Sequence, residues 1–168
     1  ALLICSLAGY GFELYHDKAK DKLFAILLLA MMIPQVATMI PLFKIMSHAK
    51  LLNIVWAFAL PVISTTFLIM MFRQNSRNFP VDIIEAARID GCSETGIFFK
   101  MYMPVQKATY AAAAVITFMN AWNAYMWPKV VMNKASAQTM PMLIANLAAG
   151  YKVDYGVLMM GVLFCSIP

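Results

Sequence analysis

The chain has 168 residues, of which 62% are hydrophobic and only 12% are charged, whereas soluble domains hold about 45–50% and about 25%. A soluble protein of this length could not bury that much apolar surface, so the composition predicts a membrane protein. The net charge of +5 comes from scattered basic residues that form no stripe, which argues against a nucleic-acid partner and favours loops that face anionic lipid.

Apolar runs and polar connections alternate along the whole chain. Five apolar segments are candidate membrane-spanning helices, at residues 1–12, 23–43, 54–72, 109–128 and 156–168. The three middle segments are each long enough to cross about 30 Å of hydrocarbon at about 1.5 Å per residue. The first looks like the end of a span and the last like a beginning, and the chain starts without methionine. We therefore expect a fragment that lacks both ends, with residues 1–168 in one membrane domain.

Four polar connections join these segments, at residues 13–22, 44–53, 73–108 and 129–155. Alternation across the membrane puts the first and third connections on one side, and that side carries eight of the 13 lysine and arginine residues. Because cytoplasmic loops hold the excess of basic residues, the sequence predicts that 13–22 and 73–108 face the cytoplasm.

The three middle apolar segments contain no Asp, Glu, Lys, Arg or His. Ion-coupled carriers usually need an ionisable group within the membrane, so this pattern disfavours such a carrier. Uphill transport by this chain would need energy delivered from outside the membrane.

Three prolines interrupt the spans, and each frees the carbonyl four residues earlier. The pairs are Pro34 with Ala30, Pro41 with Ala37, and Pro61 with Ala57.

The segment 109–128 ends in amides and aromatic rings. On a continuous helix, Asn120, Asn123 and Trp127 share one face, with Trp122 and Tyr125 adjacent. Such groups suit the path of a polar, uncharged solute such as a sugar, and Asn120, Trp122 and Asn123 are the candidate path residues. The alternative is that the amides join helices and the tryptophans anchor at the membrane interface, and the sequence leaves both interpretations open.

Charge is concentrated in one stretch, from Arg73 to Ala108, which holds nine of the 21 charged side chains. We expect this stretch to lie in water as a folded helix–turn–helix. Asp82 and Glu85 have the spacing of a helix N-cap and its N3 partner. A run of good helix formers follows from Glu85 to Arg88.

The turn and the second helix have their own signals. Asp90-Gly91 supplies a helix stop. Ser93 can cap a second short helix, which we expect to run to Met103 and to end before Pro104.

Enzyme chemistry finds little support in the sequence. Both histidines are solitary, and the chain has no Gly-rich phosphate loop, no His-Glu-x-x-His helix and no carboxylate pair within a span. The three cysteines show no metal-ligand spacing. We expect no catalytic residue, no metal, no cofactor and no means of hydrolysing a nucleotide.

One family matches these motifs. Glu85-Ala86-Ala87, then Asp90-Gly91, then Pro104 thirteen residues beyond the glycine, resembles the EAA signature of bacterial ATP-binding-cassette importer permeases. Further strings look like the maltose-type carbohydrate permease branch, namely Ile33-Pro34 through Pro41-Leu42-Phe43, Ala121-Trp122-Asn123, MWP at 126–128, TMPMLIANL at 139–147 and DYG at 154–156. The resemblance covers essentially the whole chain.

The resemblance implies an all-α, polytopic helical bundle of the type I importer kind in the bacterial plasma membrane, with 73–108 as its cytoplasmic coupling segment. Such a permease is not itself an enzyme. Its partners would be a second related permease, a cytoplasmic ATPase dimer and an extracellular solute-binding protein. A sugar or oligosaccharide is the expected solute, with a polyamine, phosphate or amino acid as the alternative. The sugar site can also lie mostly in the second permease.

The resemblance also implies roles for the coupling residues. Glu85 would pair with a basic group on the ATPase, Ala86 and Ala87 would permit close approach, and Gly91 would make the turn between the helices. Asp90 would cap or brace the second helix. For Arg88, an intrahelical pair with Glu85 at i, i+3 and a contact with the ATPase remain equally open.

Overall fold

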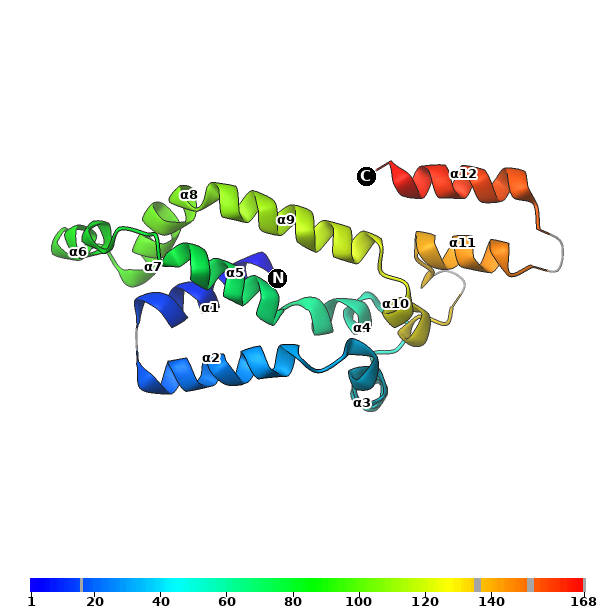
Figure 1. Cartoon of the computed structure of the whole chain (residues 1–168), viewed down its shortest axis with the longest axis horizontal. Coiled ribbons are helices and arrows are strands. Elements are labelled where there is room, and N and C mark those ends of the chain that lie inside the picture. The colour runs from blue at the N-terminus through cyan, green and yellow to red at the C-terminus, as the bar shows by residue number, and fades with distance from the viewer. Residues whose placement is uncertain (16, 135–136, 151–152, 168) are drawn as a thin grey trace. The chain divides into compact units, whose positions relative to one another are not determined.

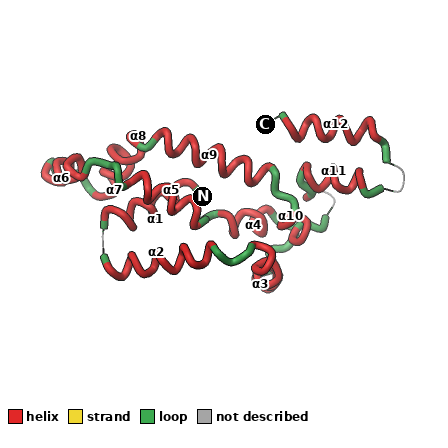
Figure 2. Tube along the Cα trace, viewed as in Figure 1, coloured by secondary structure: helices red, strands yellow, loops and turns green. Residues whose placement is uncertain are grey.

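A computed structural model of the chain describes residues 1–15, 17–134, 137–150 and 153–167. Positions 16, 135–136, 151–152 and 168 fall in the predicted connections 13–22 and 129–155 and at the last residue, and they lie outside the described residues. Every regular element in the described ranges is a helix, as Figure 1 and Figure 2 show. The all-α prediction is confirmed. The helices form two units, Ala1–Ile33 with Ile63–Thr117 and Pro34–Val62 with Phe118–Pro168.

Unit 1 is built around the packing of α1 on α5. Its helices are α1 (Leu2–Leu14), α2 (Lys18–Met31), α5 (Thr66–Ser76), α6 (Val81–Ile89), α7 (Glu94–Ile97), the π-turn η2 (Phe98–Tyr102), α8 (Met103–Val105) and most of α9 (Lys107–Trp122). At Gly9, an added Cβ would lie 2.7 Å from both the backbone nitrogen of Arg73 and the Cβ of Phe72. Glycine therefore lets the two helices approach to backbone contact. Buried Cys5 and Leu68 fill the interface beside Phe72.

A second core in unit 1 lies under α6 and α7. Its buried members are Tyr10, Phe79, Ile84, Ala87, Ile97, Phe98 and Tyr102. The aromatic rings meet mainly edge to face, with the Tyr10 and Tyr102 centroids 4.8 Å apart, a geometry that favours aromatic pairs. The charged stretch of the sequence is thus folded on a core that it shares with Tyr10 of α1.

Unit 2 has a core where α3, α4 and α10 meet. Its helices are α3 (Gln35–His48), α4 (Val55–Ala59), the 3-10 turn η1 (Leu60–Val62), α10 (Met126–Val131), α11 (Met140–Ala148) and α12 (Tyr155–Ser166), with the last part of α9. Met46, Ala57, Trp127 and Val131 are buried together. The Trp127 indole donates to the carbonyl of Ala57 at 3.0 Å. This is the carbonyl that Pro61 frees, so the unmet acceptor predicted there is satisfied by a tertiary contact.

Asn53 fixes the turn after α3 against the end of α10. Its φ is +62°, a left-handed conformation that asparagine tolerates. Its backbone nitrogen donates to the carbonyl of Val131 at 2.9 Å, and its side-chain oxygen accepts from the backbone nitrogens of Asn133 and Lys134 at 2.6 and 3.0 Å. Beyond this region, α11 and α12 lie side by side (Figure 1).

The predicted spans are broken into shorter helices. No single helix in the described residues is long and apolar enough to cross a membrane alone, whereas two consecutive pairs meet that test together. The pairs are Lys18–Met31 with Gln35–His48, and Val55–Val62 with Thr66–Ser76. The interruptions predicted at Pro34 and Pro61 are therefore present in the spans 23–43 and 54–72. Pro34 is the N-cap of α3 at the first break, where a proline disfavours the α conformation of the residue before it. Pro61 lies in η1 before the second break. Pro41 stays inside α3.

Candidate functional site

The turn between α6 and α7 is the best-defined part of the charged segment. Gly91 has φ +77°, its nitrogen donates to the carbonyl of Arg88 at 3.0 Å, and the nitrogen of Cys92 donates to that of Ala87 at 2.9 Å. This pair of bonds around a left-handed glycine is the Schellman ending of a helix. The predicted stop at Asp90-Gly91 is confirmed. We call the segment Val81–Ile97 the α6–α7 hairpin.

The ends of the hairpin helices differ in part from the sequence prediction. Pro80 is the N-cap of α6, and no side chain caps it, so the predicted Asp82 cap is wrong. Asp82 instead lies in the first helical turn, where its charge suits the helix dipole. Ser93 caps α7 as predicted, since its hydroxyl accepts from the nitrogen of Gly96 at 3.2 Å. The alternative assignment of that cap to Asp90 is therefore corrected.

The helical path after α7 continues further than predicted. Phe98–Tyr102 forms a π-turn and Met103–Val105 a further helical turn, so the second helix does not end before Pro104. The π-helix is rare and occurs mostly as a single turn within a helical segment. Here it precedes a proline whose ring would clash with the carbonyl four residues earlier in a regular α-helix.

The two faces of α6 separate the predicted coupling residues. Glu85 and Ala86 are exposed, and Ile89, at the end of the helix, is 87% exposed. Ile84 and Ala87 are buried in the hairpin's own core. The interpretation of Ala87 as a residue of the docking surface is therefore corrected, because it shapes the hairpin from inside.

Arg88 has a partner that the sequence analysis missed. Its Nε donates to Oε1 of Glu94 at 2.7 Å, so the ion pair joins α6 to α7 across the Gly91 turn. The ion pair of Arg88 is thus with Glu94 and not with Glu85 in its own helix. The guanidinium of Arg88, more than any other group, holds the pKa of the Glu94 carboxyl below its usual range. The hairpin is thus closed by a backbone turn and by a charged bond.

The sequence predicts that the whole charged stretch lies in water, but its first residue, Arg73, is buried inside unit 1. Arg73 belongs to α5 and is only 7% exposed. Its Nε lies 3.0 Å from Oε2 of Glu13, its Nη2 lies 2.9 Å from Oδ1 of Asp21, and its guanidinium stacks on the ring of Phe24 at 4.1 Å. Buried charge persists where it is paired in this way. The sequence feature that could have predicted this buried position is the place of Arg73, one turn before the end of an apolar helix.

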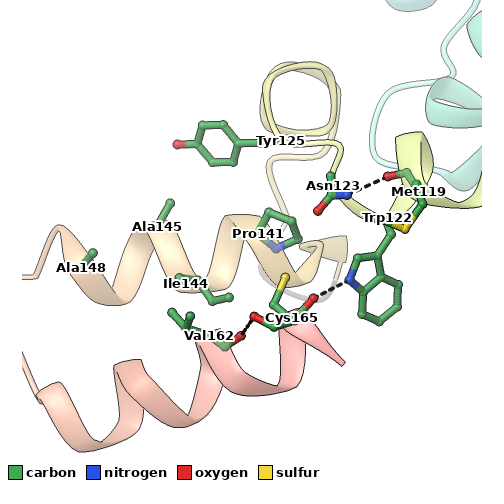
Figure 3. Close-up of a pocket in the computed structure, with 11 residues that line it drawn as sticks. Met119, Trp122, Asn123, Tyr125, Pro141, Ile144, Ala145, Ala148, Val162 and Cys165 are labelled. Carbon is green, nitrogen blue, oxygen red and sulfur yellow. Dashed lines mark hydrogen bonds between the residues drawn. The ribbon is translucent and has the colours of Figure 1, made fainter. Parts of the chain in front are cut away.

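A pocket of about 520 Å³ lies in unit 2, within the range of about 300–1,000 Å³ that small-molecule sites occupy. Figure 3 shows it. Its lining residues come from the end of α9, the following turn, α11 and α12: Met119, Trp122, Asn123, Tyr125, Pro141, Ile144, Ala145, Ala148, Val162, Cys165 and Ser166. None of these side chains carries a charge.

Two of the three predicted path residues line this pocket. The Trp122 indole donates to the carbonyl of Cys165 at 2.9 Å, and the Asn123 amide nitrogen donates to the carbonyl of Met119 at 3.0 Å (Figure 3). Asn120 is exposed and is not part of the lining. The predicted shared face is wrong, because α9 ends at Trp122 and Trp127 lies in the separate helix α10.

Comparison with known proteins identifies the family and its fold. Residues 1–167 match the family model described as "Binding-protein-dependent transport system inner membrane component". The chain is 44% identical to the lactose transport system permease protein of Rhizobium radiobacter over 99% of its own length and 61% of that protein. It is 32% identical to the arabinooligosaccharides transport system permease protein of Bacillus subtilis (strain 168) over 99% of its length and 59% of that protein.

More distant relatives complete the comparison. The sn-glycerol-3-phosphate transport system permease protein of Pectobacterium atrosepticum is 28% identical over 82% of the chain and 49% of that protein. A solved bacterial ABC transporter involved in the import of the acidic polysaccharide alginate gives a TM-score of 0.77 at 22% identity, over 94% of this chain and 58% of that one. This likeness confirms the expected fold class. The chain spans about 60% of the length of the two sugar-transport relatives above.

Proposed function

The chain belongs to the family of binding-protein-dependent transport system inner membrane components, and from this premise we propose that it is a permease subunit of an ATP-driven importer of a sugar or oligosaccharide. The family description confirms the membrane localisation that the composition predicts. In this proposal the chain forms half of the translocation path and performs no catalysis. Its partners are a second related permease, a cytoplasmic ATPase dimer and an extracellular solute-binding protein.

The observation that carries the proposal is the α6–α7 hairpin. Its short helix α6 presents Glu85 and Ala86 to solvent and ends in a Schellman turn at Gly91, and in our proposal it is the docking element. The ATPase dimer would receive this helix in a cleft and move it when the dimer closes on ATP. Glu85 would bind a basic group there, since a charge-assisted hydrogen bond needs an accessible carboxylate.

The pocket favours a neutral solute. A phosphate ester or another anion would need positive charge or several donors along its path, and none of the lining residues is charged. Relatives named for lactose and arabinooligosaccharide transport are 44% and 32% identical to this chain, against 28% for one named for sn-glycerol-3-phosphate transport. The lining contains the aromatic rings of Trp122 and Tyr125 and the amide of Asn123, which are kinds of group that bind sugars. Phe118 stacks on the Trp122 ring, and the Lys129 ammonium lies 4.9 Å from the centroid of the Tyr125 ring.

Reconstituted transport tests the function. The full-length protein and the subunits that co-purify with it would be placed in proteoliposomes, with lactose and an arabinooligosaccharide as labelled solutes. We expect uptake only when the ATPase subunit and ATP are both present. Uptake that persists without them, driven by an ion gradient, would refute the proposal.

A matched pair of substitutions tests the solute path. Asn123→Leu removes the pocket amide, whereas Asn120→Leu makes the same change three residues earlier, at a residue outside the pocket lining. We expect a higher KM for uptake in the first variant and normal uptake in the second. Equal behaviour of the two would favour the interpretation that the amides only join helices.

A further inference from the structure

A contact outside the coupling signature joins the α6–α7 hairpin to the end of α1. Tyr15, which follows α1, donates its phenol hydrogen to Oε2 of Glu94. The other carboxylate oxygen of Glu94 accepts from Arg88 at 2.7 Å. One carboxylate therefore holds together three elements: the end of α1, the end of α6 and the first residue of α7.

Tyr15 is held on its other sides as well. The Arg88 guanidinium lies 5.9 Å and the Lys20 ammonium 5.3 Å from the centroid of the Tyr15 ring, within the distance of cation–π attraction. The same ammonium donates to the Tyr15 carbonyl at 2.7 Å. The Tyr10 ring meets the Tyr15 ring edge-on at 6.0 Å. The Lys20 contacts fix the position of Tyr15 relative to α2, the Arg88 contact fixes it relative to the hairpin, and the Tyr10 contact lies within α1 and its end.

The end of α1 is also bound to α5. Glu13, two residues before Tyr15, accepts from Arg73 at 3.0 Å and lies 3.4 Å from Nε of Arg77. Charged bonds therefore connect this short stretch to the hairpin on one side and to α5 on the other. A displacement of the hairpin has a direct route to α5 through Glu13 and Tyr15.

We propose that Tyr15, Arg88 and Glu94 form a latch that makes the end of α1 move with the α6–α7 hairpin. The latch carries a displacement of the hairpin into unit 1 through Tyr15, Glu13 and Arg73. Glu94 is the positioning residue, because both latch bonds end on its carboxylate. The inference rests on the proposed function, since the ATPase supplies the displacement.

The latch is in its bonded state at neutral pH. Arg88 and then Tyr15 lower the pKa of the Glu94 carboxyl, while burial and then the bond to Glu94 raise the pKa of the Tyr15 phenol. An ionised carboxylate and a protonated phenol are therefore both present near pH 7. Because the carboxyl pKa is lowered, these bonds persist above the ordinary carboxyl pKa and are lost as the pH falls through the lowered value.

Loss of the latch bonds should affect the link between the hairpin and Tyr15 more than the folding stability of the hairpin. Arg88 and Glu94 have side chains that are 43% and 49% exposed, whereas the hairpin core consists of buried apolar residues and tyrosines. Exposed ion pairs contribute little to folding stability. Loss of the latch should therefore leave the hairpin folded and still packed on Tyr10 of α1, and should remove only its polar link to Tyr15.

Two conservative variants and one control test the latch. Tyr15→Phe removes only the hydroxyl, and Glu94→Gln removes the charge and keeps the shape, while Lys100→Gln neutralises an exposed charge elsewhere on the same segment. In the reconstituted importer, we expect both latch variants to keep normal abundance and a co-purifying ATPase. We expect the number of solute molecules moved per ATP to fall several-fold in both, and to be unchanged in the control.

A partner-independent measurement separates the latch from the proposed function. In the purified full-length protein, hydrogen exchange at the first amides of α7 should be faster in both latch variants than in the control. The charge-swapped double variant R88E/E94R keeps an ion pair across the Gly91 turn but gives Tyr15 no acceptor at position 94, so its transport per ATP should be as low as in Tyr15→Phe. Unchanged exchange overturns the latch whatever the transport result, and so does unchanged transport per ATP in Tyr15→Phe and Glu94→Gln. Failure of the unmodified importer to use ATP overturns the proposed function alone.

Discussion

The Gly91 turn offers the sharpest test of the hairpin as a coupling element. Gly91 has φ +77°, and an L-residue with a Cβ in the left-handed helical region costs about 1–2 kcal/mol. A Cβ built at this position meets no atom within 4 Å, so the cost in Gly91→Val is backbone strain without a clash inside the chain. A penalty of about 1–2 kcal/mol corresponds to a factor of about 5–30 in an equilibrium between closed and open turns.

The substitution should therefore loosen the two turn bonds to Arg88 and Ala87 and misplace α7 relative to α6. We expect Gly91→Val to reach normal abundance in the membrane, because the strain is local, and to lose most of its sugar uptake. The assays are uptake, membrane abundance and co-purification of the ATPase subunit.

Gly91→Asn is the matched control. Asparagine fills the space beyond the turn as valine does, yet it tolerates the left-handed conformation, so uptake should be largely kept. Import by Gly91→Val at the unmodified rate would refute the role of the turn. Equal damage from Asn and Val would refute the strain argument, and would indicate that the side chain collides with the partner cleft.

Three further substitutions address contacts outside the turn. Glu85→Ala removes the proposed charge-assisted bond of about 1.5–3 kcal/mol and should reduce co-purification of the ATPase at normal membrane abundance. The control Lys107→Ala should leave co-purification unchanged. Retention of the ATPase in both variants would contradict the docking role of Glu85. Trp127→Phe leaves the Ala57 carbonyl without its indole donor at a cost of about 1–3 kcal/mol, so the thermal unfolding midpoint in detergent should fall. An unchanged midpoint would count against a stabilising role of this hydrogen bond. Arg73→Met removes the buried guanidinium that bonds Glu13 and Asp21, while Glu13 keeps its contact with Arg77. The cost should therefore stay below the roughly 3–5 kcal/mol of a fully broken buried pair. We expect a lower unfolding midpoint and lower membrane abundance, and normal values of both would show that the two bonds contribute nothing.

The hairpin turn was predictable because its signals are local. A glycine after an aspartate and a serine three residues before a free backbone amide determine the end of α6 and the start of α7 without help from the rest of the fold. The Asp82 cap failed for an equally local reason. Pro80 occupies the N-cap position, and the aspartate is then already inside the helix.

The break after α9 was missed because helical periodicity assumes an uninterrupted helix. The segment 109–128 contains no charged residue, but Pro128 lacks the amide that would bond the carbonyl of Ala124 in a continuous helix. In the structure this proline lies in the first turn of α10, where a missing amide costs nothing. Pro128 was therefore the sequence feature that could have predicted the break between α9 and α10. It separates Trp127, which anchors the unit 2 core, from Trp122 and Asn123, which line the pocket.

The charged side chains of unit 1 show what a pattern along the chain cannot reveal. Concentrated charge in an apolar protein predicts a water-exposed segment, and for Glu85 the structure agrees. Arg73, however, uses its charge to bind two other helices from a buried position, and Glu94 uses its charge to bind Tyr15, which is 79 residues away in sequence. Only the fold brings such partners together. Since a coupling element must both accept a force and pass it on, the exposed carboxylate can serve the first task while the tertiary ion pairs serve the second.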